Sequence, residues 1–456
     1  MREGAATDIL LDFIVNTPSE EIPEKARAAC RTFLLDSLGV AVAGSGAPWA
    51  DRLVGQQRRW GTGNDATAWV FGDRLPAPAA AFVNAYLIHN SEFDCIHERA
   101  VVHPMAVTLP ALMAVAERDG GVSGSAFLAA LATGVEVACT IGMAATGGMR
   151  FFRPATAGAF GAVAAIGRLR GMDKATLRNA MGVVYGQLSG NMQAHTEGSV
   201  LLAMQVGFNA RNAVIACDIA EAGVSAPQDM LEGEFGYFAL FEERHDFAPA
   251  VTHLGRPWCI AEVAHKPFPS GRATHGVLDA LLELRREHGF TAEDIAAIEA
   301  RVPPLTYQLV ARKPQPGMTP NQARLCIGYV AARALRSGAL LVEDFTPDAL
   351  SDPETFALAE KVAVMKDGNP DPNVLAPVSV RVTTQDGGSL ERTQALIYGN
   401  PAKPMSREAH LEKFRSNWCA GAIALPVEEG ERLIALVDQI ASVSDMREIA
   451  AQLVLP

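Results

Sequence analysis

Apolar residues recur with helical spacing along most of the first 262 residues. Alanine- and leucine-rich segments alternate there with turns that contain glycine, asparagine or proline. The predicted helices cover residues 6–15, 22–43, 78–88, 110–116, 125–144, 159–169, 174–185 and 204–222. Their many small residues favour close helix–helix packing. We therefore predict a large all-helical domain over residues 1–264.

The pattern changes between residues 265 and 404, where apolar and polar residues alternate as they do in strands. The predicted elements are strands over 295–302, 378–384 and 389–397, a turn at 385–388, and helices over 323–336 and 354–364. From residue 406 the pattern is helical again, over 408–414 and 423–436. We predict a mainly α protein with an α+β second domain. Residues 405–456 complete the helical domain, and residues 265–404 form a smaller α+β lid domain.

A proline-containing segment at 266–275, Lys-Pro-Phe-Pro-Ser-Gly-Arg-Ala-Thr-His, holds three basic side chains. Its prolines exclude a regular helix start, so the next helix is predicted from Gly276. Arg272, Thr274 and His275 then lie at or just before that helix N-terminus, where free N–H groups favour an anion. The segment indicates a carboxylate or phosphate site. The alternative is an interdomain linker whose cations are only solvated.

A second polar cluster, from His89 to His103, holds three histidines and three carboxylates. Carboxylate–imidazole groups suit proton transfer, because each tunes the pKa of the other. They also suit metal ions, but the spacing of Glu92, Asp94 and His97 differs from compact zinc motifs, and no cysteine pair supports it. We therefore predict no metal. In the alternative interpretation, Asp94 caps a helix and His103 is a hydrogen-bonded core residue.

Composition and charge narrow the class of protein and its partners. Hydrophobic residues make up 49% and charged residues 20% of the chain, as in many globular enzymes. The formal charge of −12, without a long basic run, argues against nucleic acid. Seven dispersed cysteines without a CxxC pair indicate reduced thiols and a cytoplasmic protein. The N-terminus lacks signal-peptide features, and the apolar stretch 120–149 contains Glu136, so we expect buried helices and no membrane partner.

Four parts of the chain carry distinctive motifs. They are Leu-Leu-Asp-Ser-Leu-Gly at 34–39, the region from Asn84 through Phe93-Asp94 to His103-Pro104, the segment 266–275, and residues 398–406 followed by Lys413-Phe414. Together these motifs resemble the signatures of the MmgE/PrpD family over nearly the whole chain. The resemblance implies a helical domain, a smaller α+β lid, an active site between them, a homodimer and no cofactor.

The resemblance also implies a reaction class. The family includes 2-methylcitrate dehydratase, cis-aconitate decarboxylase and iminodisuccinate epimerase, which act on small polycarboxylates by removing a proton α to a carboxylate. We therefore expect an enzyme on a di- or tricarboxylate, a lyase of the dehydratase or decarboxylase type. One alternative is a cofactor-independent epimerase of a multi-carboxylate amino acid such as iminodisuccinate. The other is a non-catalytic carboxylate-binding protein with a degenerate site.

The chain departs from the family pattern at several positions. Glu92 stands where aspartate is usual, Gly271 replaces the signature cysteine, and Arg153 replaces a histidine. The stretch 202–207 lacks the family's lysine and histidine, and Arg324 lies near a position that is commonly glutamine. These exchanges remove groups that transfer protons and add arginine. Arginine binds carboxylates with two parallel hydrogen bonds but stays protonated.

The candidate site therefore has an acid/base part and a binding part. The candidate acid/base residues are His103, Lys266 and Asp94, with Tyr329 as a further proton donor. The predicted substrate-binding residues are Arg153, Arg272, His275, Arg150, Arg324 and Glu92. In the alternative interpretation, Arg150 and Arg324 pair only with surface acids. A lysine serves as a base only where burial or nearby cations lower its pKa.

Overall fold

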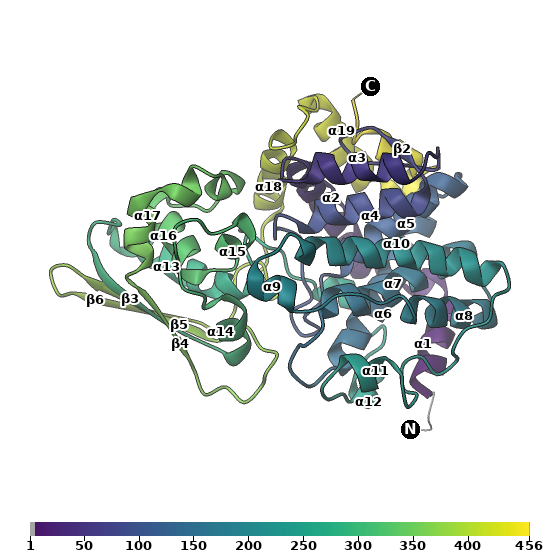
Figure 1. Ribbon diagram of the computed structural model, residues 1–456, viewed down its shortest axis with the longest axis horizontal. Coiled ribbons are helices and arrows are strands. Elements are labelled where there is room, and N and C mark those ends of the chain that lie inside the picture. The colour runs from purple at the N-terminus through teal and green to yellow at the C-terminus, as the bar shows by residue number, and fades with distance from the viewer. Residues whose placement is uncertain (1–4, 456) are drawn as a thin grey trace.

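The helical segments of the first half of the chain form a layered domain around one central helix, α5 (Figure 1). The computed structural model describes residues 5–455. The helices of this domain are α1 (Ala5–Asn16), α2 (Glu24–Ser45), α3 (Ala50–Trp60), α4 (Ala77–His89), α5 (Pro104–Asp119), α6 (Gly124–Ala144), α7 (Arg153–Arg170), α8 (Lys174–Tyr185), α9 (Gln193–Glu197), α10 (Leu201–Glu221), α11 (Tyr237–Phe241) and α12 (Phe247–Thr252). Two short strands, β1 (Ala66–Thr67) and β2 (Arg74–Leu75), pair antiparallel beside them.

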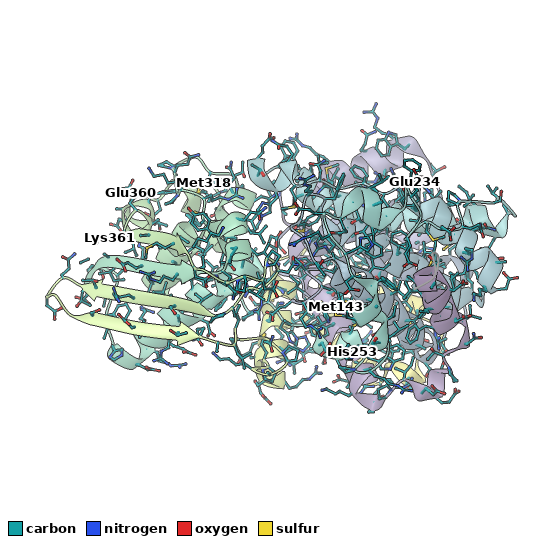
Figure 2. All side chains as sticks on the ribbon, turned by 90° about the horizontal axis from the view of Figure 1, so that it is seen from below. Met143, Glu234, His253, Met318, Glu360 and Lys361 are labelled. Carbon is teal, nitrogen blue, oxygen red and sulfur yellow. The ribbon has the colours of Figure 1, made fainter. Side chains whose placement is uncertain are left out.

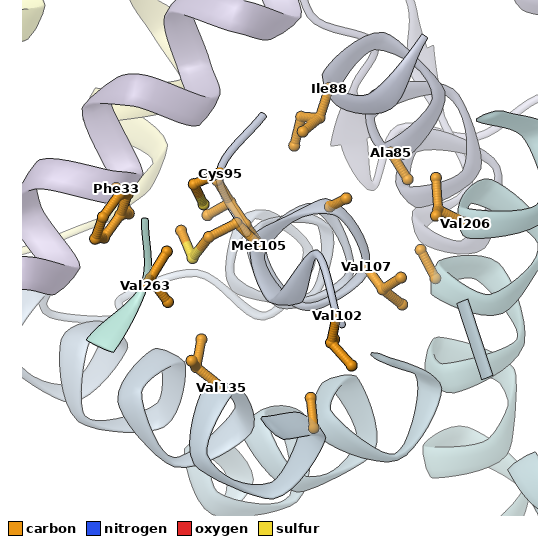
Figure 3. Close-up of a cluster of buried hydrophobic side chains, with 14 of the residues drawn as sticks. Phe33, Ala85, Ile88, Cys95, Val102, Met105, Val107, Val135, Val206 and Val263 are labelled. Carbon is orange, nitrogen blue, oxygen red and sulfur yellow. The ribbon is translucent and has the colours of Figure 1, made fainter. Parts of the chain in front are cut away.

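Helix α5 is buried on all sides along residues 104–117. It packs against α4, α7, α10 and α6. Figure 3 shows Met105 and Val107 of this helix with Val135 of α6 and Val206 of α10 around them. A helix that is apolar around its whole circumference belongs in a protein core. The segment that precedes α5 is therefore tied to the most rigid part of the domain.

Helix α6 is the most apolar long helix of the domain. Within residues 5–455 it is the one helix whose length and composition would allow it to cross a membrane, and 89% of its most apolar stretch is buried in the protein. Its neighbours are α7, α5 and α2. The apolar surface of α6 is thus covered by packing inside the domain.

The smaller domain is built on a four-stranded sheet in the order β4-β3-β5-β6. Its strands are β3 (Ile295–Val302), β4 (Val362–Lys366), β5 (Val378–Thr384) and β6 (Ser389–Gln394), and its helices are α13 (Arg272–His288), α14 (Pro304–Val310), α15 (Pro320–Arg324), α16 (Ile327–Ser337) and α17 (Pro353–Ala359). Strand β3 pairs parallel with β4 and antiparallel with β5. Val378, Val380 and Val382 alternate as buried residues on β5, which packs on α13. Figure 2 shows this domain, with Glu360 and Lys361, projecting from the helical one.

The chain ends in three helices, α18 (Arg407–Cys419), α19 (Val427–Asp438) and α20 (Arg447–Ala451). Helices α18 and α19 pack on α2, and α20 packs on α5. The C-terminal segment therefore returns to the helical domain, as its pattern predicts. The predicted fold class, mainly α with an α+β second domain, is confirmed. The limits at residues 264 and 405 stay a prediction.

One predicted helix is partly wrong. The helix predicted over 354–364 ends at Ala359, and Val362–Lys366 forms strand β4 instead. Ile298 of β3 lies opposite Val362 in the parallel pairing. Valines at 362 and 364 suit a strand, because branching at Cβ fits the pleated surface. The partner strand lies about sixty residues away in sequence, so the local pattern could not reveal the pairing.

Several other predicted helix boundaries also differ, such as that of α7, which begins at Arg153 instead of residue 159. The helix predicted over 323–336 is interrupted after Arg324, where α15 ends and α16 begins at Ile327. Helix α5 begins at Pro104 instead of residue 110, because a proline without an N–H suits the first turn. Helix α13 begins at Arg272 and not at Gly276. Arg272 thus lies inside the first helical turn.

Candidate active site

The segment between α4 and α5, residues 90–103, carries much of the predicted acid/base chemistry. Two of its residues, Glu92 (φ 52°) and Val101 (φ 51°), adopt the left-handed backbone conformation. This conformation is unfavourable for residues other than glycine, above all for a β-branched one such as valine. Contacts with the rest of the protein therefore hold the segment in one shape.

Asp94 lies at the centre of this segment, fully buried between two imidazoles. Its Oδ2 atom is 3.0 Å from Nδ1 of His89 and 3.0 Å from Nδ1 of His103. The two imidazole rings meet edge to face, with their centroids 4.8 Å apart. His89 is the last residue of α4, and His103 immediately precedes α5. The end of α4 and the start of α5 thus place both imidazole rings against the carboxylate of Asp94.

Lys266 joins this cluster from the far side of the sequence. Its Nζ donates to Glu92 Oε2 at 2.8 Å and to the Glu92 carbonyl at 3.1 Å, and it lies 3.9 Å from Asp94 Oδ1. Ile96 and Ala264 form an isolated antiparallel bridge that holds the two segments together. The structure therefore brings Glu92, Asp94, His103 and Lys266 together, as the candidate site requires.

The charges in the cluster separate the pKa values of its members. Burial opposes ionisation of Glu92, but Lys266 and the two imidazoles lower its pKa to about 2. Burial also opposes ionisation of Asp94, yet His89 and His103 lower its pKa well below the usual range. Burial disfavours the charged form of His89, but the charge of Asp94 raises its pKa. For His103, burial and then the charge of Lys266 lower the pKa despite Asp94. His103 is thus the neutral imidazole of the pair near neutral pH, which suits a base.

A cavity of about 60 Å³ lies beside His103, and we call it the His103 cavity. The residues around it are Glu92, Ile96, Val101, His103, Met149, Phe152, Pro154, His195, Gly271, Arg272, Ala273, Leu309, Val310, Leu325 and Leu375. They come from the helical domain and from the lid. The His103 cavity therefore lies between the helical domain and the lid.

His195 of α9 lines this cavity, and the sequence interpretation missed it. Burial and then the charge of Arg312 lower its pKa to about 4, so the ring is neutral near neutral pH. The one available signal was the scarcity of histidine, with ten in the chain. That signal is weak, because His195 follows no recognisable motif and its neighbourhood departs from the family pattern.

Arg153 is engaged inside the helical domain. Its Nε and Nη2 donate to the two carboxylate oxygens of Glu242, each at 3.0 Å, and both side chains are buried. Tyr237 also donates its hydroxyl to Glu242. The positive charge of Arg153 is therefore already neutralised. The contact between Arg153 and substrate stays a prediction. The ion pair with Glu242 does not favour it.

Arg272 lines the His103 cavity and also ties the lid together. It donates to Glu98 Oε1 at 2.7 Å and to the backbone carbonyls of residues 265, 397 and 398. His275 lies behind it, with Nε2 3.2 Å from the Ser270 carbonyl. Burial, followed by the charge of Arg272, lowers the pKa of His275 well below its usual range. His275 is thus a neutral residue that packs against Arg272.

Three other predicted site residues lie elsewhere. Arg150 is exposed. The hydroxyl of Tyr329 donates to the Asp344 carbonyl at 2.6 Å inside the core of the lid. Arg324 is buried and donates to the Asn90 carbonyl at 3.2 Å, and it lines a different cavity. The structure therefore does not gather these three side chains around the His103 cavity.

The Asp94 cluster has a donor set that could hold a metal ion. Ligand atoms of His89, Asp94 and His103 lie within 4.8 Å of one another. Lys266 lies 3.9 Å from the same carboxylate and opposes a cation there. The charges of the residues present therefore fit a proton-transfer site better than a metal site.

Comparison with known proteins identifies the family of the chain. The model of the MmgE/PrpD N-terminal domain matches residues 8–250, and that of the MmgE/PrpD C-terminal domain matches residues 268–439. The human cis-aconitate decarboxylase is 28% identical over 435 residues, which cover 91% of this chain and 87% of the relative. The Aspergillus terreus cis-aconitate decarboxylase is 26% identical over 463 residues, covering 95% and 93%. The chain therefore belongs to the MmgE/PrpD family.

Proposed function

We propose that this chain is a lyase on a small polycarboxylate, in which His103 moves the proton next to a carboxylate. The observation that carries the proposal is the 3.0 Å contact between Asp94 and His103 Nδ1 beside the His103 cavity. A carboxylate on one ring nitrogen orients an imidazole and leaves the other nitrogen for substrate. Because its pKa is lowered, His103 is neutral and can accept a proton near neutral pH.

The surroundings of the cavity suit a negatively charged reaction centre. Removing a proton α to a carboxylate creates an enolate-like charge, which nearby cations and proton donors stabilise. Arg272 lines the cavity, and Lys266 is held by Glu92 next to the Asp94 pair. In our proposal Arg272 faces a substrate carboxylate across the cavity while it keeps its ion pair with Glu98. Lys266 is the second proton-transfer group of the proposal.

The names of the relatives favour decarboxylation of an unsaturated tricarboxylate of the cis-aconitate type. In that reaction the bond between carbon and one carboxylate breaks, and CO2 leaves. The electron pair moves through the neighbouring double bond, and the carbon at its far end takes up a proton. Protonated His103 or Lys266 supplies that proton in our proposal.

A second candidate function is epimerisation of a multi-carboxylate substrate. Two neutral imidazoles, His103 and His195, line the same cavity. Inversion at carbon needs one of them to accept the proton in its neutral form while the other, in its protonated form, returns a proton to the opposite face. We rank this reaction second, because the names of the relatives support decarboxylation.

Proton NMR of the purified chain in D2O distinguishes these reactions. The substrates are cis-aconitate, citrate, 2-methylcitrate and iminodisuccinate, each tested alone. We expect a decarboxylated or dehydrated product from at least one of them. Deuterium at an α-carbon without loss of CO2 or water would instead establish the epimerase. Absence of any change across the four acids would contradict the proposed substrate class.

A further inference from the structure

A second, larger cavity of about 710 Å³ lies between the helical domain and the lid. The turn after α2 lines it from the helical domain, and Met318, Phe345 and Leu350 line it from the lid. Ser91 and Arg324 complete the lining, and we call it the Arg324 cavity. Among residues 5–455, it shares no lining residue with the His103 cavity. The two cavities are therefore separate spaces.

Arg324 is 5% exposed and lacks the partners that a buried guanidinium needs. Its one hydrogen bond to a described residue runs from Nη1 to the Asn90 carbonyl at 3.2 Å. Its Nε is buried without a partner, and Arg324 forms no salt bridge within 4.0 Å among residues 5–455. Burial lowers the pKa of Arg324, and the more distant charge of Glu92 opposes this shift. One face of the guanidinium rests on the Phe345 ring, 4.8 Å from its centroid. An anion in the cavity would supply the missing partner.

A second unpartnered polar group lines the same cavity. Ser91 is 1% exposed, and its Oγ is buried without a hydrogen-bond partner. Buried polar groups in native proteins are nearly always hydrogen-bonded. Both atoms have almost no accessible surface, so a ligand in the cavity reaches them only after a small rotation of the two side chains. A cation and a hydroxyl donor on one cavity suit the same anionic ligand group.

We propose that the Arg324 cavity binds a small monocarboxylate with an apolar body. Its carboxylate accepts hydrogen bonds from Arg324 and Ser91, and its apolar part packs against Met318, Phe345 and Leu350. A guanidinium is the side chain best suited to bind a carboxylate with two parallel hydrogen bonds. Met318 can be located on the lid in Figure 2.

The lining also argues against a polycarboxylate in this cavity. Glu343 is among the lining residues and would repel a second carboxylate. Apart from Arg324, the lining contains no lysine, arginine or histidine within residues 5–455. The ligand therefore differs in charge from the polycarboxylate proposed for the His103 cavity.

Such a ligand would act next to the catalytic segment. Ser91 directly precedes Glu92, whose carboxylate holds Lys266 at 2.8 Å. Arg324 contacts the Asn90 carbonyl of the same segment. The ligand would also join the lid to the helical domain, because the cavity has walls from both. The binding site in our proposal is thus independent of the reaction that the His103 cavity performs.

Isothermal titration calorimetry with octanoate tests the proposal on the full chain. We expect octanoate to bind wild type, and octylamine, which reverses the charge, not to bind. Arg324→Met should weaken the binding of octanoate at least about tenfold, because a hydrogen bond to a charged group is lost. Met matches the length of the apolar stem and removes an unpaired buried charge, so this variant should fold. Ser91→Ala should weaken the binding of octanoate about two- to tenfold.

His103→Gln is the matched control, because it alters the other cavity. It should bind octanoate as wild type does. Failure of octanoate to bind wild type would overturn the proposal. Equal binding to wild type and Arg324→Met would overturn it too, and loss of binding in His103→Gln would assign octanoate to the other cavity.

Discussion

At the scale of single residues, Asp94 shifts the pKa values of its two imidazole partners in a way that separates their roles. Burial affects both rings, but the charge of Asp94 prevails for His89, whose pKa is raised. Burial and Lys266 prevail for His103, whose pKa is lowered. The raised pKa favours the charged form of His89 beside the carboxylate, and the lowered pKa favours the neutral form of His103. This division explains how one buried carboxylate can serve two histidines.

The lowered pKa of His103 predicts the pH dependence of the reaction. For decarboxylation, in which protonated His103 is a proton donor, kcat/KM falls as the pH rises through the pKa of His103. For a reaction that begins with removal of an α-proton, the base form is the active one, so kcat/KM falls as the pH falls through the pKa of His103 in the free enzyme. We expect either limb to be centred below pH 6.5, the ordinary value for histidine. A pH profile of kcat/KM with the substrate found by NMR measures it. A limb centred above 6.5 would contradict the assigned environment of His103.

Arg153 provides a residue-scale test of a structural role. Arg153→Met leaves Glu242 buried without its cation, which destabilises a protein by about 3–5 kcal/mol. Replacing both residues by methionine removes the unpaired charge, and we expect most of that stability to return. Thermal unfolding of the two variants measures this. Equal instability in both variants would show that the ion pair does not account for the effect.

The roles of single residues were predictable where residues of the required chemical types lie close together in the sequence. His103, Asp94 and Lys266 could be named because carboxylates, imidazoles and a lysine are concentrated in two short segments. Tyr329 was assigned by resemblance, but the fold commits its hydroxyl to a carbonyl of the lid. His195 was missed because only the tertiary structure brings α9 to the cavity.

At the scale of elements, α6 and α7 approach closely through two glycines. A Cβ on Gly134 would lie 2.6 Å from the Gly161 carbonyl oxygen, and one on Gly161 would lie 2.5 Å from that of Gly134. Helices can pack this closely only where side chains are absent at the contact. Gly134 and Gly161 are thus two of the small residues that produce the predicted close helix–helix packing.

Gly134→Ala should destabilise the protein by about 1–3 kcal/mol, because overpacking forces the two helices apart. Gly55 in α3 gives a matched control, since a Cβ there meets nothing within 4 Å. Gly55→Ala should stabilise by about 0.5–1 kcal/mol through the loss of glycine flexibility in a helix. Differential scanning calorimetry compares them. Shifts in Tm of the same sign would contradict the packing argument.

The elements that sequence reasoning placed wrongly are those set by distant partners. Strand β4 continues directly from a helical pattern, and only its parallel pairing with β3 makes it a strand. The break between α15 and α16 is likewise invisible in their shared apolar spacing. By contrast, β3, β5 and α8 occupy the residues that their own patterns predict. Local periodicity was sufficient for those elements.

At the scale of the whole molecule, the two domains enclose a cavity of only about 60 Å³ beside His103. Cavities that hold small ligands usually measure about 300–1,000 Å³. We therefore infer that the lid moves away from the helical domain when substrate enters. The lid contributes α14 and the start of α13 to the cavity wall.

Hydrogen–deuterium exchange should detect this motion. We expect the amides of α14, residues 304–310, to exchange more slowly once the substrate is bound, because it holds the lid closed. Helix α5 in the core should show no change. If substrate leaves exchange in α14 unaltered, the lid does not open and close around the His103 cavity.

The most direct test of the central claim is the release of CO2 from cis-aconitate by wild type and by His103→Gln. We predict release by wild type and a rate at least about 100-fold lower in the variant, with unchanged thermal unfolding, because a positioned acid/base group contributes that much. Equal rates in the two proteins would contradict the role of His103. Absence of CO2 with wild type would contradict decarboxylation as the reaction of this chain.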